Sequence, residues 1–294
     1  MFLGAHVSSA EGIWKAVDRG VELGCDAIQI FTQSPRMWRP TAHADEALAR
    51  FRERRAETGM GPVVCHALYL VNLATPDRAM RKKSETALQA TLEVAAAIES
   101  EGVVLHLGSH LGSGFGNGIK RVVPVLTRLL DLTNDTTWLL LENSAGAGAT
   151  IGRSLDEPAT IIDKLGRHRR LGICLDSCHL WVSGVDVTDP DALDACVAEL
   201  DESIGLDRLR ALHVNDAAAP LGSNRDHHAN VGSGELGRGL GTFLVHPSFQ
   251  GLPALLETPG SDGHGPDRAE MRRLRDLYRR ASRGSATRRA AGRS

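Results

Sequence analysis

Eight short apolar segments, separated by longer segments of helical character, constrain the fold of this chain more than any other feature of its sequence. The apolar segments have the length of buried strands and span residues 2–7, 26–32, 63–67, 103–107, 138–143, 171–176, 209–214 and 254–258. The helix-like segments that follow them span residues 11–23, 43–57, 77–100, 118–132, 156–166, 190–203, 238–246 and 267–281. Strands that are apolar on both faces and alternate with helices are typical of a closed parallel sheet. The sequence therefore predicts an α/β fold, a (β/α)8 TIM barrel.

The length of the chain fits a single barrel of this kind. Such a barrel needs about 250 residues, and the chain has 294, of which 42% are hydrophobic. We therefore expect one domain over residues 1–281. Residues 282–294 are small, polar and basic, and we expect them to form a disordered tail.

The charge and composition limit where the protein acts. Residues 271–294 hold nine arginines and one aspartate, a net charge of +8, which leaves about −10 on the rest of a chain whose total is −2. The N-terminus lacks the features of a signal peptide, and no apolar run approaches the roughly 20 residues of a membrane span. Five irregularly spaced cysteines do not suggest a disulfide framework. We expect a cytoplasmic monomer without membrane association.

Nine polar side chains lie at the ends of the predicted strands or in the loops that follow them. They are His66, His106, Glu142, Asp176, His179, His213, Asp226, His228 and Glu257. A lone histidine at a strand end is more often a hydrogen-bonded core residue than a ligand. The joint placement is different, because the carboxyl ends of all barrel strands meet on one face. The sequence therefore predicts a multinuclear metal centre at the C-terminal face of the barrel.

The residue types in this set indicate the metal and the chemistry. Mixed imidazoles and carboxylates suit zinc or manganese, whereas carboxylates alone would suggest magnesium or calcium. Five neutral histidines and four carboxylates carry −4, three divalent cations change this to +2, and a bridging hydroxide leaves +1. Such a pocket attracts a phosphate and can stabilise an in-line displacement. Without metal the carboxylates would repel one another, so we also expect the metal to be structural.

Local spacing supports the same interpretation. An extended backbone places Asp226 and His228 on one side, because side chains alternate along a strand. Asp176 and His179 lie three residues apart where a strand ends, so the turn can aim them at neighbouring ions. Cys174 and Cys178 flank this pair, but there is no second cysteine pair, and we expect no thiolate zinc site.

Motifs along nearly the whole chain, from Gly4 to about Pro259, resemble those of the endonuclease IV family, the zinc-dependent apurinic/apyrimidinic endonucleases of base-excision repair. The matching segments are residues 4–8, 35–38, 66–73, 106–110, 142–146, 174–179, 213–216, 226–228 with 231–234, and 255–258. The segment Cys174–His179 is the most specific match. His227, Leu107 and Ser233 depart from the arginine, proline and glutamate that the family usually or often has there. None of the three is a ligand, so the departures concern DNA contacts more than the metal centre.

The resemblance implies a ligand set and a reaction. Three zinc ions per chain, replaceable by Mn²⁺, would be held by His66, His106 and Glu142; by Glu142, Asp176, His213 and Glu257; and by His179, Asp226 and His228. Glu142 and Glu257 would also be catalytic. The reaction would be hydrolysis of the DNA phosphodiester 5′ to an abasic site by a metal-bound hydroxide, which leaves a 3′-hydroxyl and a 5′ deoxyribose phosphate.

The resemblance also implies a partner, double-stranded DNA that contains abasic sites, with His6, Arg36 and Tyr69 in contact with it. Reaching the sugar-phosphate at such a lesion requires that the nucleotide be extruded from the duplex. The arginine-rich tail is at most a non-specific electrostatic aid, because the last helix of a barrel runs away from the strands' C-terminal face.

Two other functions compete with this one. A metal-dependent sugar isomerase or epimerase on a similar barrel would use only Glu142, Asp176, His213 and Glu257, and it would leave the other five predicted ligands without a role. A non-catalytic metal- or DNA-binding module on an old enzyme scaffold would be expected to lack at least one ligand, and none is missing from the sequence.

Overall fold

The computed structural model describes residues 1–133 and 136–291, with side chains up to residue 284. Eight parallel strands close into a barrel in the order β1-β10-β7-β6-β5-β4-β3-β2. They are β1 (Phe2–His6), β2 (Ala27–Phe31), β3 (Val63–His66), β4 (Gly102–Leu105), β5 (Trp138–Glu142), β6 (Leu171–Asp176), β7 (Leu209–His213) and β10 (Pro253–Leu256). Each lies within about two residues of its predicted range, and the predicted (β/α)8 TIM barrel is confirmed.

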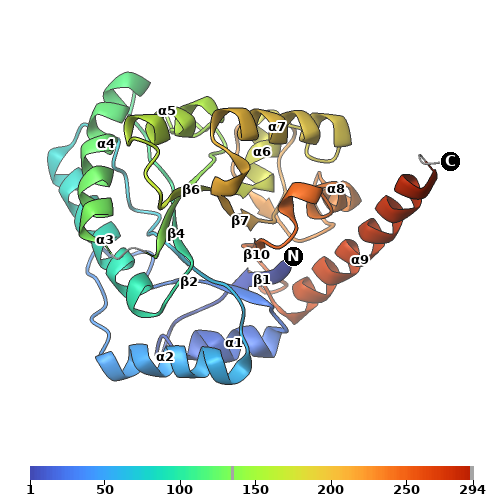
Figure 1. Cartoon of the computed structure of the whole chain (residues 1–294), viewed down its shortest axis with the longest axis horizontal. Coiled ribbons are helices and arrows are strands. Elements are labelled where there is room, and N and C mark those ends of the chain that lie inside the picture. The colour runs from blue at the N-terminus through green and yellow to red at the C-terminus, as the bar shows by residue number, and fades with distance from the viewer. Residues whose placement is uncertain (134–135, 292–294) are drawn as a thin grey trace.

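Helices surround the barrel and connect successive strands (Figure 1). They are α1 (Lys15–Leu23), α2 (Asp45–Thr58), α3 (Arg78–Ala97), α4 (Phe115–Leu132), α5 (Asp156–Lys164), α7 (Pro190–Ser203), α8 (Leu240–Leu244) and α9 (Arg268–Ala291), with short 3-10 turns η1 (Leu206–Arg208), η2 (Gly237–Gly239) and η3 (Pro247–Phe249). Local sequence sets their limits: Asp77 caps α3 by accepting hydrogen bonds from Ala79 N and Met80 N. Gly24 ends α1 in the left-handed conformation that glycine tolerates best. Within the described residues, no helix is both long and apolar enough to cross a membrane.

Four elements differ from the prediction. Helix α6 (Ser177–Ser183) begins directly after β6, and a short antiparallel pair, β8 (Asp216–Ala217) with β9 (His228–Ala229), forms inside the loop after β7. Helix α9 continues to Ala291 instead of ending near residue 281, so the described part of the expected tail has a helical backbone. Arginine and alanine favour helix strongly, which accounts for the longer helix. Residues 292–294 of the expected tail lie outside the described residues, and the disorder of the tail stays a prediction. The domain boundary at residue 281 stays a prediction.

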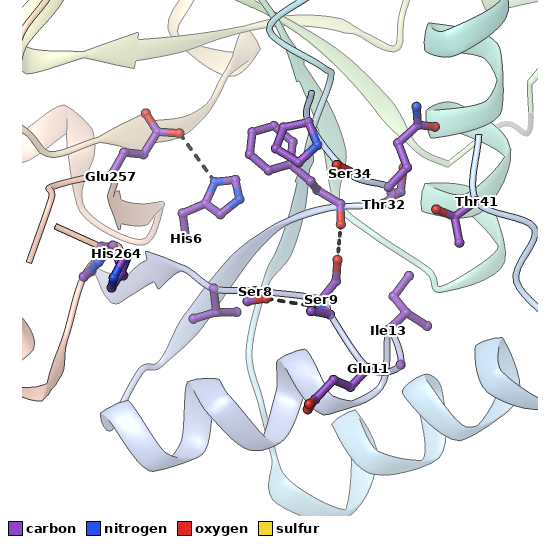
Figure 2. A pocket seen from close by; sticks show the side chains of 18 of the residues that line it. His6, Ser8, Ser9, Glu11, Ile13, Thr32, Ser34, Thr41, Glu257 and His264 are labelled. Atoms are coloured by element: carbon purple, nitrogen blue, oxygen red, sulfur yellow. Dashed lines mark hydrogen bonds and ion pairs between the residues drawn. The ribbon is translucent and has the colours of Figure 1, made fainter. Parts of the chain in front are cut away.

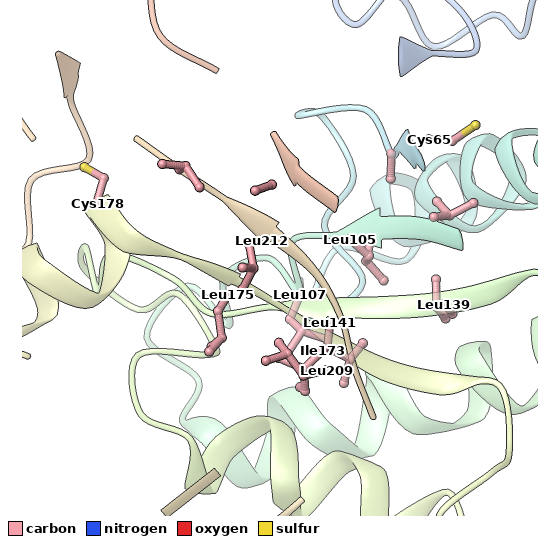
Figure 3. Close-up of a cluster of buried hydrophobic side chains, with 14 of the residues drawn as sticks. Cys65, Leu105, Leu107, Leu139, Leu141, Ile173, Leu175, Cys178, Leu209 and Leu212 are labelled. Carbon is pink, nitrogen blue, oxygen red and sulfur yellow. The ribbon is translucent and has the colours of Figure 1, made fainter. Parts of the chain in front are cut away.

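Side chains alternate along the strands between two cores. Outward-facing residues such as Leu139, Leu141 and Ile173 pack against the helices (Figure 3). Inward-facing residues fill the barrel itself, and they are Ala27, Val64, Val104, Leu140, Cys174, Ala211 and Leu255. The barrel interior is therefore a packed floor rather than a pore.

Candidate metal centre

The polar residues of the site stand one step above this floor. Because side chains on a strand repeat with period two, the residue two positions after each floor residue also points inward. These second-layer residues are Gln29, His66, His106, Glu142, Asp176, His213 and Glu257. Six of the seven belong to the predicted ligand set. The strand pattern therefore delivers most of the site to the carboxyl ends of the strands, where the prediction placed it.

The structure brings all nine predicted residues together in three groups, within each of which the possible ligand atoms lie within 4.8 Å of one another. We call His66, His106 and Glu142 the rim group; Glu142, Asp176, His213 and Glu257 the floor group; and His179, Asp226 and His228 the loop group. Glu142 joins the first two, with Oε2 3.3 Å from His66 Nε2 and Oε1 2.9 Å from His213 Nδ1.

Hydrogen bonds aim the imidazoles at these groups. His66 Nδ1 lies 2.6 Å from the carbonyl oxygen of Ala67, and His179 Nδ1 lies 2.8 Å from that of Asn143. A carbonyl oxygen only accepts, so each Nδ1 donates a proton there, and each Nε2 is left as the nitrogen that could bind an ion. Such fixing of the tautomer by the second ring nitrogen is typical of metal-binding histidines.

The loop group has the geometry of a cation site. His179 Nε2 and His228 Nε2 lie 3.3 Å from the two oxygens of Asp226, yet neither nitrogen makes a well-formed hydrogen bond in the described structure. Both are buried, and a buried polar atom without a well-formed hydrogen bond is costly. Two imidazole lone pairs and one carboxylate around a common point fit a zinc ion with an open position.

Electrostatics show what holds the cluster together without metal. Burial alone would raise the pKa of Glu142, but His106 and His213 hold it well below its usual range. Burial would lower the pKa of His179, but Asp176 and Asp226 raise it well above its usual value. His228 behaves in the same way, and its pKa rises to about 9 through its contact with Asp226. Protons on histidines thus stand where cations would bind, and metal binding must displace them.

Three supporting residues were not predicted. Gln29 lies at the centre, with Oε1 2.8 Å from His213 Nε2 and Nε2 2.6 Å from Glu257 Oε1. Asn215 Nδ2 donates to Asp176 Oδ2 at 2.6 Å, and Asn143 Oδ1 accepts from Asp176 N at 2.7 Å. Gln29 could have been found from its place two residues after the floor residue Ala27. The two asparagines lie close to predicted ligands in the sequence, but their orientation depends on the fold.

Cys178 completes a further possible group with Asp176 and His228. Its sulfur lies 3.9 Å from the carbonyl oxygen of His227 and donates its weak hydrogen bond there. Burial raises the pKa of the thiol, which keeps it protonated. Since the thiolate is the form that binds zinc, Cys178 is a poorer ligand than His228.

Two cavities that share Tyr69 in their lining open onto the groups. One, of about 620 Å³, is lined by His6, Phe31 and Glu257 among others; Figure 2 shows His6 pointing toward Glu257. The other, of about 580 Å³, reaches His106, His179 and Asp226. Tyr69 lines both and is 60% exposed.

Of the three residues expected to contact DNA, two lie near the ligand groups and one does not. His6 and Tyr69 lie beside the centre, whereas Arg36 is exposed on the loop after β2 and lines neither cavity.

Known proteins are similar to this chain in sequence and in fold. A family model described as "Xylose isomerase-like TIM barrel" matches residues 17–280. A curated relative from Halothermothrix orenii, named "Probable endonuclease 4", is 38% identical over 268 residues, which are 91% of this chain and 96% of that protein. The crystal structure of endonuclease IV from Thermus thermophilus is 34% identical, with a TM-score of 0.83, and covers 97% of this chain and 100% of that one. A D-psicose 3-epimerase structure is 16% identical with a TM-score of 0.65, covers 97% and 98% of the two chains, and shows the shared fold alone.

Proposed function

Because this chain belongs to the endonuclease IV family of DNA-repair nucleases, we propose that it cuts the DNA phosphodiester 5′ to apurinic/apyrimidinic sites, with three zinc ions bound to its nine clustered ligands. The products are a 3′-hydroxyl and a 5′ deoxyribose phosphate. Mn²⁺ can replace zinc in this proposal, the partner is double-stranded DNA that contains an abasic site, and the enzyme acts as a cytoplasmic monomer.

The loop group is the observation that carries this proposal. A single-ion site needs only the floor group. Such a site would give no role to the convergence of His179, Asp226 and His228. The Nε2 atoms of His179 and His228 converge on the two oxygens of Asp226 at 3.3 Å without a well-formed hydrogen bond, and this supports a cation at this position. Together with the rim and floor groups, which share Glu142, the loop group would hold enough cationic charge to stabilise the negative charge that develops in a phosphodiester displacement. When bound, the ions supply Lewis-acid stabilisation of the phosphate oxygens.

The chain's own residues have distinct tasks in this proposal. Glu142 is buried and uses both carboxylate oxygens, so it holds the rim and floor groups at a set separation. Gln29 donates to Glu257 and lies against His213, which fixes both relative to the floor of the barrel. Tyr69 lines both cavities and is exposed, so it can contact the DNA beside an extruded sugar.

A sugar isomerase or epimerase is the alternative that the fold allows. The floor group alone resembles such a single-ion site, and solved epimerases share the barrel at low identity. The alternative gives no role to the loop group or to two of the three rim residues, and we therefore favour the nuclease.

Incision of a duplex with one abasic site in an end-labelled strand tests the proposal. We expect one cut 5′ to the site, and a product that a DNA polymerase extends without further treatment, because its end is a 3′-hydroxyl. A duplex with an intact nucleotide at that position is the control. Absence of incision by zinc-loaded protein, together with interconversion of free ketoses, would favour the epimerase.

A further inference from the structure

A buried carboxylate outside the three ligand groups binds the backbone of the loop that carries Asp226 and His228. Asp216 is fully buried at the start of the long segment after β7. Its Oδ2 accepts from Gly232 N and Gly234 N, both at 3.0 Å, and its Oδ1 accepts from Leu236 N at 2.9 Å. Gly237 N donates to it as well, at 3.2 Å. Hydrogen bonds to an ionised acceptor are about twice as strong as neutral ones, so this carboxylate pins the returning end of the loop.

The fit at this point leaves no room for a side chain. A Cβ on Gly234 would lie 2.3 Å from the carbonyl oxygen of Ala217 and 2.6 Å from Asp216 Oδ1. Gly232 has a φ of +79°, which favours glycine. The backbone of residues 232–237 is therefore shaped to wrap around this one carboxylate.

The pinned segment lies beside the loop group through the β8–β9 pair. Asp216 pairs with Ala229 and Ala217 pairs with His228, while Ala218 N donates to the carbonyl oxygen of His227 at 2.8 Å. His228 thus has the strand that begins with Asp216 on one side. Its Nδ1 lies 3.3 Å from the carbonyl oxygen of Glu257 on the other.

A second buried carboxylate holds the same loop from the side of α9. Glu270 is fully buried, and its Oε2 accepts from Val231 N and from the hydroxyl of Thr258, both at 3.0 Å. Its other oxygen pairs with Arg273. Asn230 links the same stretch to Gly260 through two hydrogen bonds of 2.9 Å. The residues directly after Ala229 are therefore attached to the loop that follows β10 and to the first turn of α9.

We propose that Asp216 and Glu270 are positioning residues that set the place of Asp226 and His228, and so set the affinity of the loop group for its ion. This inference rests on the proposed three-ion function. Asp226 is 49% exposed and lies ten residues beyond Asp216 on a surface loop. A metal site requires its ligands within about 0.5 Å of the productive geometry. Asp216 stands at the start of the segment that must meet this requirement, and both carboxylates bind residues 231–237 just after it.

Metal content of two conservative variants tests the proposal. In Asp216→Asn one acceptor oxygen becomes an N–H donor that faces the loop amides, and in Glu270→Gln the same change occurs beside Val231. Loss of such supporting contacts typically lowers metal affinity about 10- to 100-fold. We expect both variants to hold two zinc ions instead of three at limiting zinc, and to recover the third ion and incision at excess zinc.

Asp26→Asn is the matched control. Asp26 accepts a hydrogen bond from Leu3 N at 3.1 Å and pairs with Arg275 just before β2, at the opposite end of the barrel. This variant should lose stability without losing the third ion at limiting zinc. The comparison therefore separates positioning of the loop group from general destabilisation of the barrel.

Hydrogen exchange of metal-free protein provides the second readout. The amides of residues 231–237 should exchange faster in Asp216→Asn and Glu270→Gln than in wild type, and equally in Asp26→Asn and wild type. A wild-type affinity for three ions in both test variants would overturn the inference and leave the proposed function standing. If wild-type protein itself binds fewer than three ions, the proposed function fails, and unchanged exchange in the variants would then overturn the positioning claim separately. If Asp216→Asn does not fold, Glu270→Gln decides by the same criteria.

Discussion

Replacing Asp226 with alanine should abolish the contribution of the loop group while the barrel survives. Asp226 is the only carboxylate of that group, and its two oxygens lie 3.3 Å from His179 Nε2 and His228 Nε2. Two imidazoles alone bind zinc poorly, so the ion should be lost. Removing one source of charge stabilisation costs about two to four orders of magnitude in rate, which is roughly 3 to 5 kcal/mol in the barrier. Half of the Asp226 side chain is exposed, so its removal leaves no large cavity.

The assay is single-turnover incision of an abasic duplex, with the zinc content measured on the same preparation. Asp163→Ala is the control, because Asp163 is an exposed carboxylate on α5 that pairs with Arg167. We expect the control to keep three ions and the wild-type rate, and Asp226→Ala to keep about two ions. Incision within threefold of wild type by Asp226→Ala, with only two ions bound, would refute a catalytic role for the loop group.

Three further predictions follow from the same geometry. Arg36→Ala or Tyr69→Ala should weaken binding to abasic duplex without changing zinc content, and salt should weaken it further because phosphate contacts release counterions; unchanged binding in both variants would exclude these loops from recognition. Gln29→Leu should lower zinc affinity of the floor group about 10- to 100-fold, because it removes the contacts that orient His213 and Glu257; full zinc retention against a chelator would contradict this. In metal-free protein, the protonated form of His228 stabilises the fold, because folding raises the pKa of this residue from about 6.5 to about 9. This stabilisation is complete at pH values below about 6.5 and is lost as the pH rises through 9. Melting temperature should therefore fall between pH 6.5 and 9.5, and a rise over that range would show the sign to be wrong.

The sequence predicted the barrel and the gathering of the ligands for one physical reason. Leu140 and Glu142, or Cys174 and Asp176, lie two apart on apolar strands, and this pattern alone implies a floor with a polar layer above it. Placing His179 and Asp226 needed more than the pattern. His179 reaches the centre because α6 starts directly after Asp176, and Asp226 reaches it because the β8–β9 pair folds the loop back.

Contacts between distant residues could not be predicted in this way. Gln29 and Glu257 are 228 positions apart, and Asp216 accepts from amides that lie 16 to 21 positions later. These hydrogen bonds depend on which loop residues face each other in the folded chain. The periodic pattern of apolar and polar residues along the sequence does not predict such contacts. The end of α9 was also placed too early, because the local helix propensity of arginine and alanine carries the helix to Ala291.

Titration of metal-free protein with zinc, with incision of an abasic duplex measured at each step, tests the three-ion centre most directly. The groups share Glu142 but differ in ligands, so zinc should fill them in succession. We predict little incision up to two equivalents, a steep rise between the second and third, and no further gain beyond the third. Full incision at one equivalent of zinc would contradict the three-ion centre.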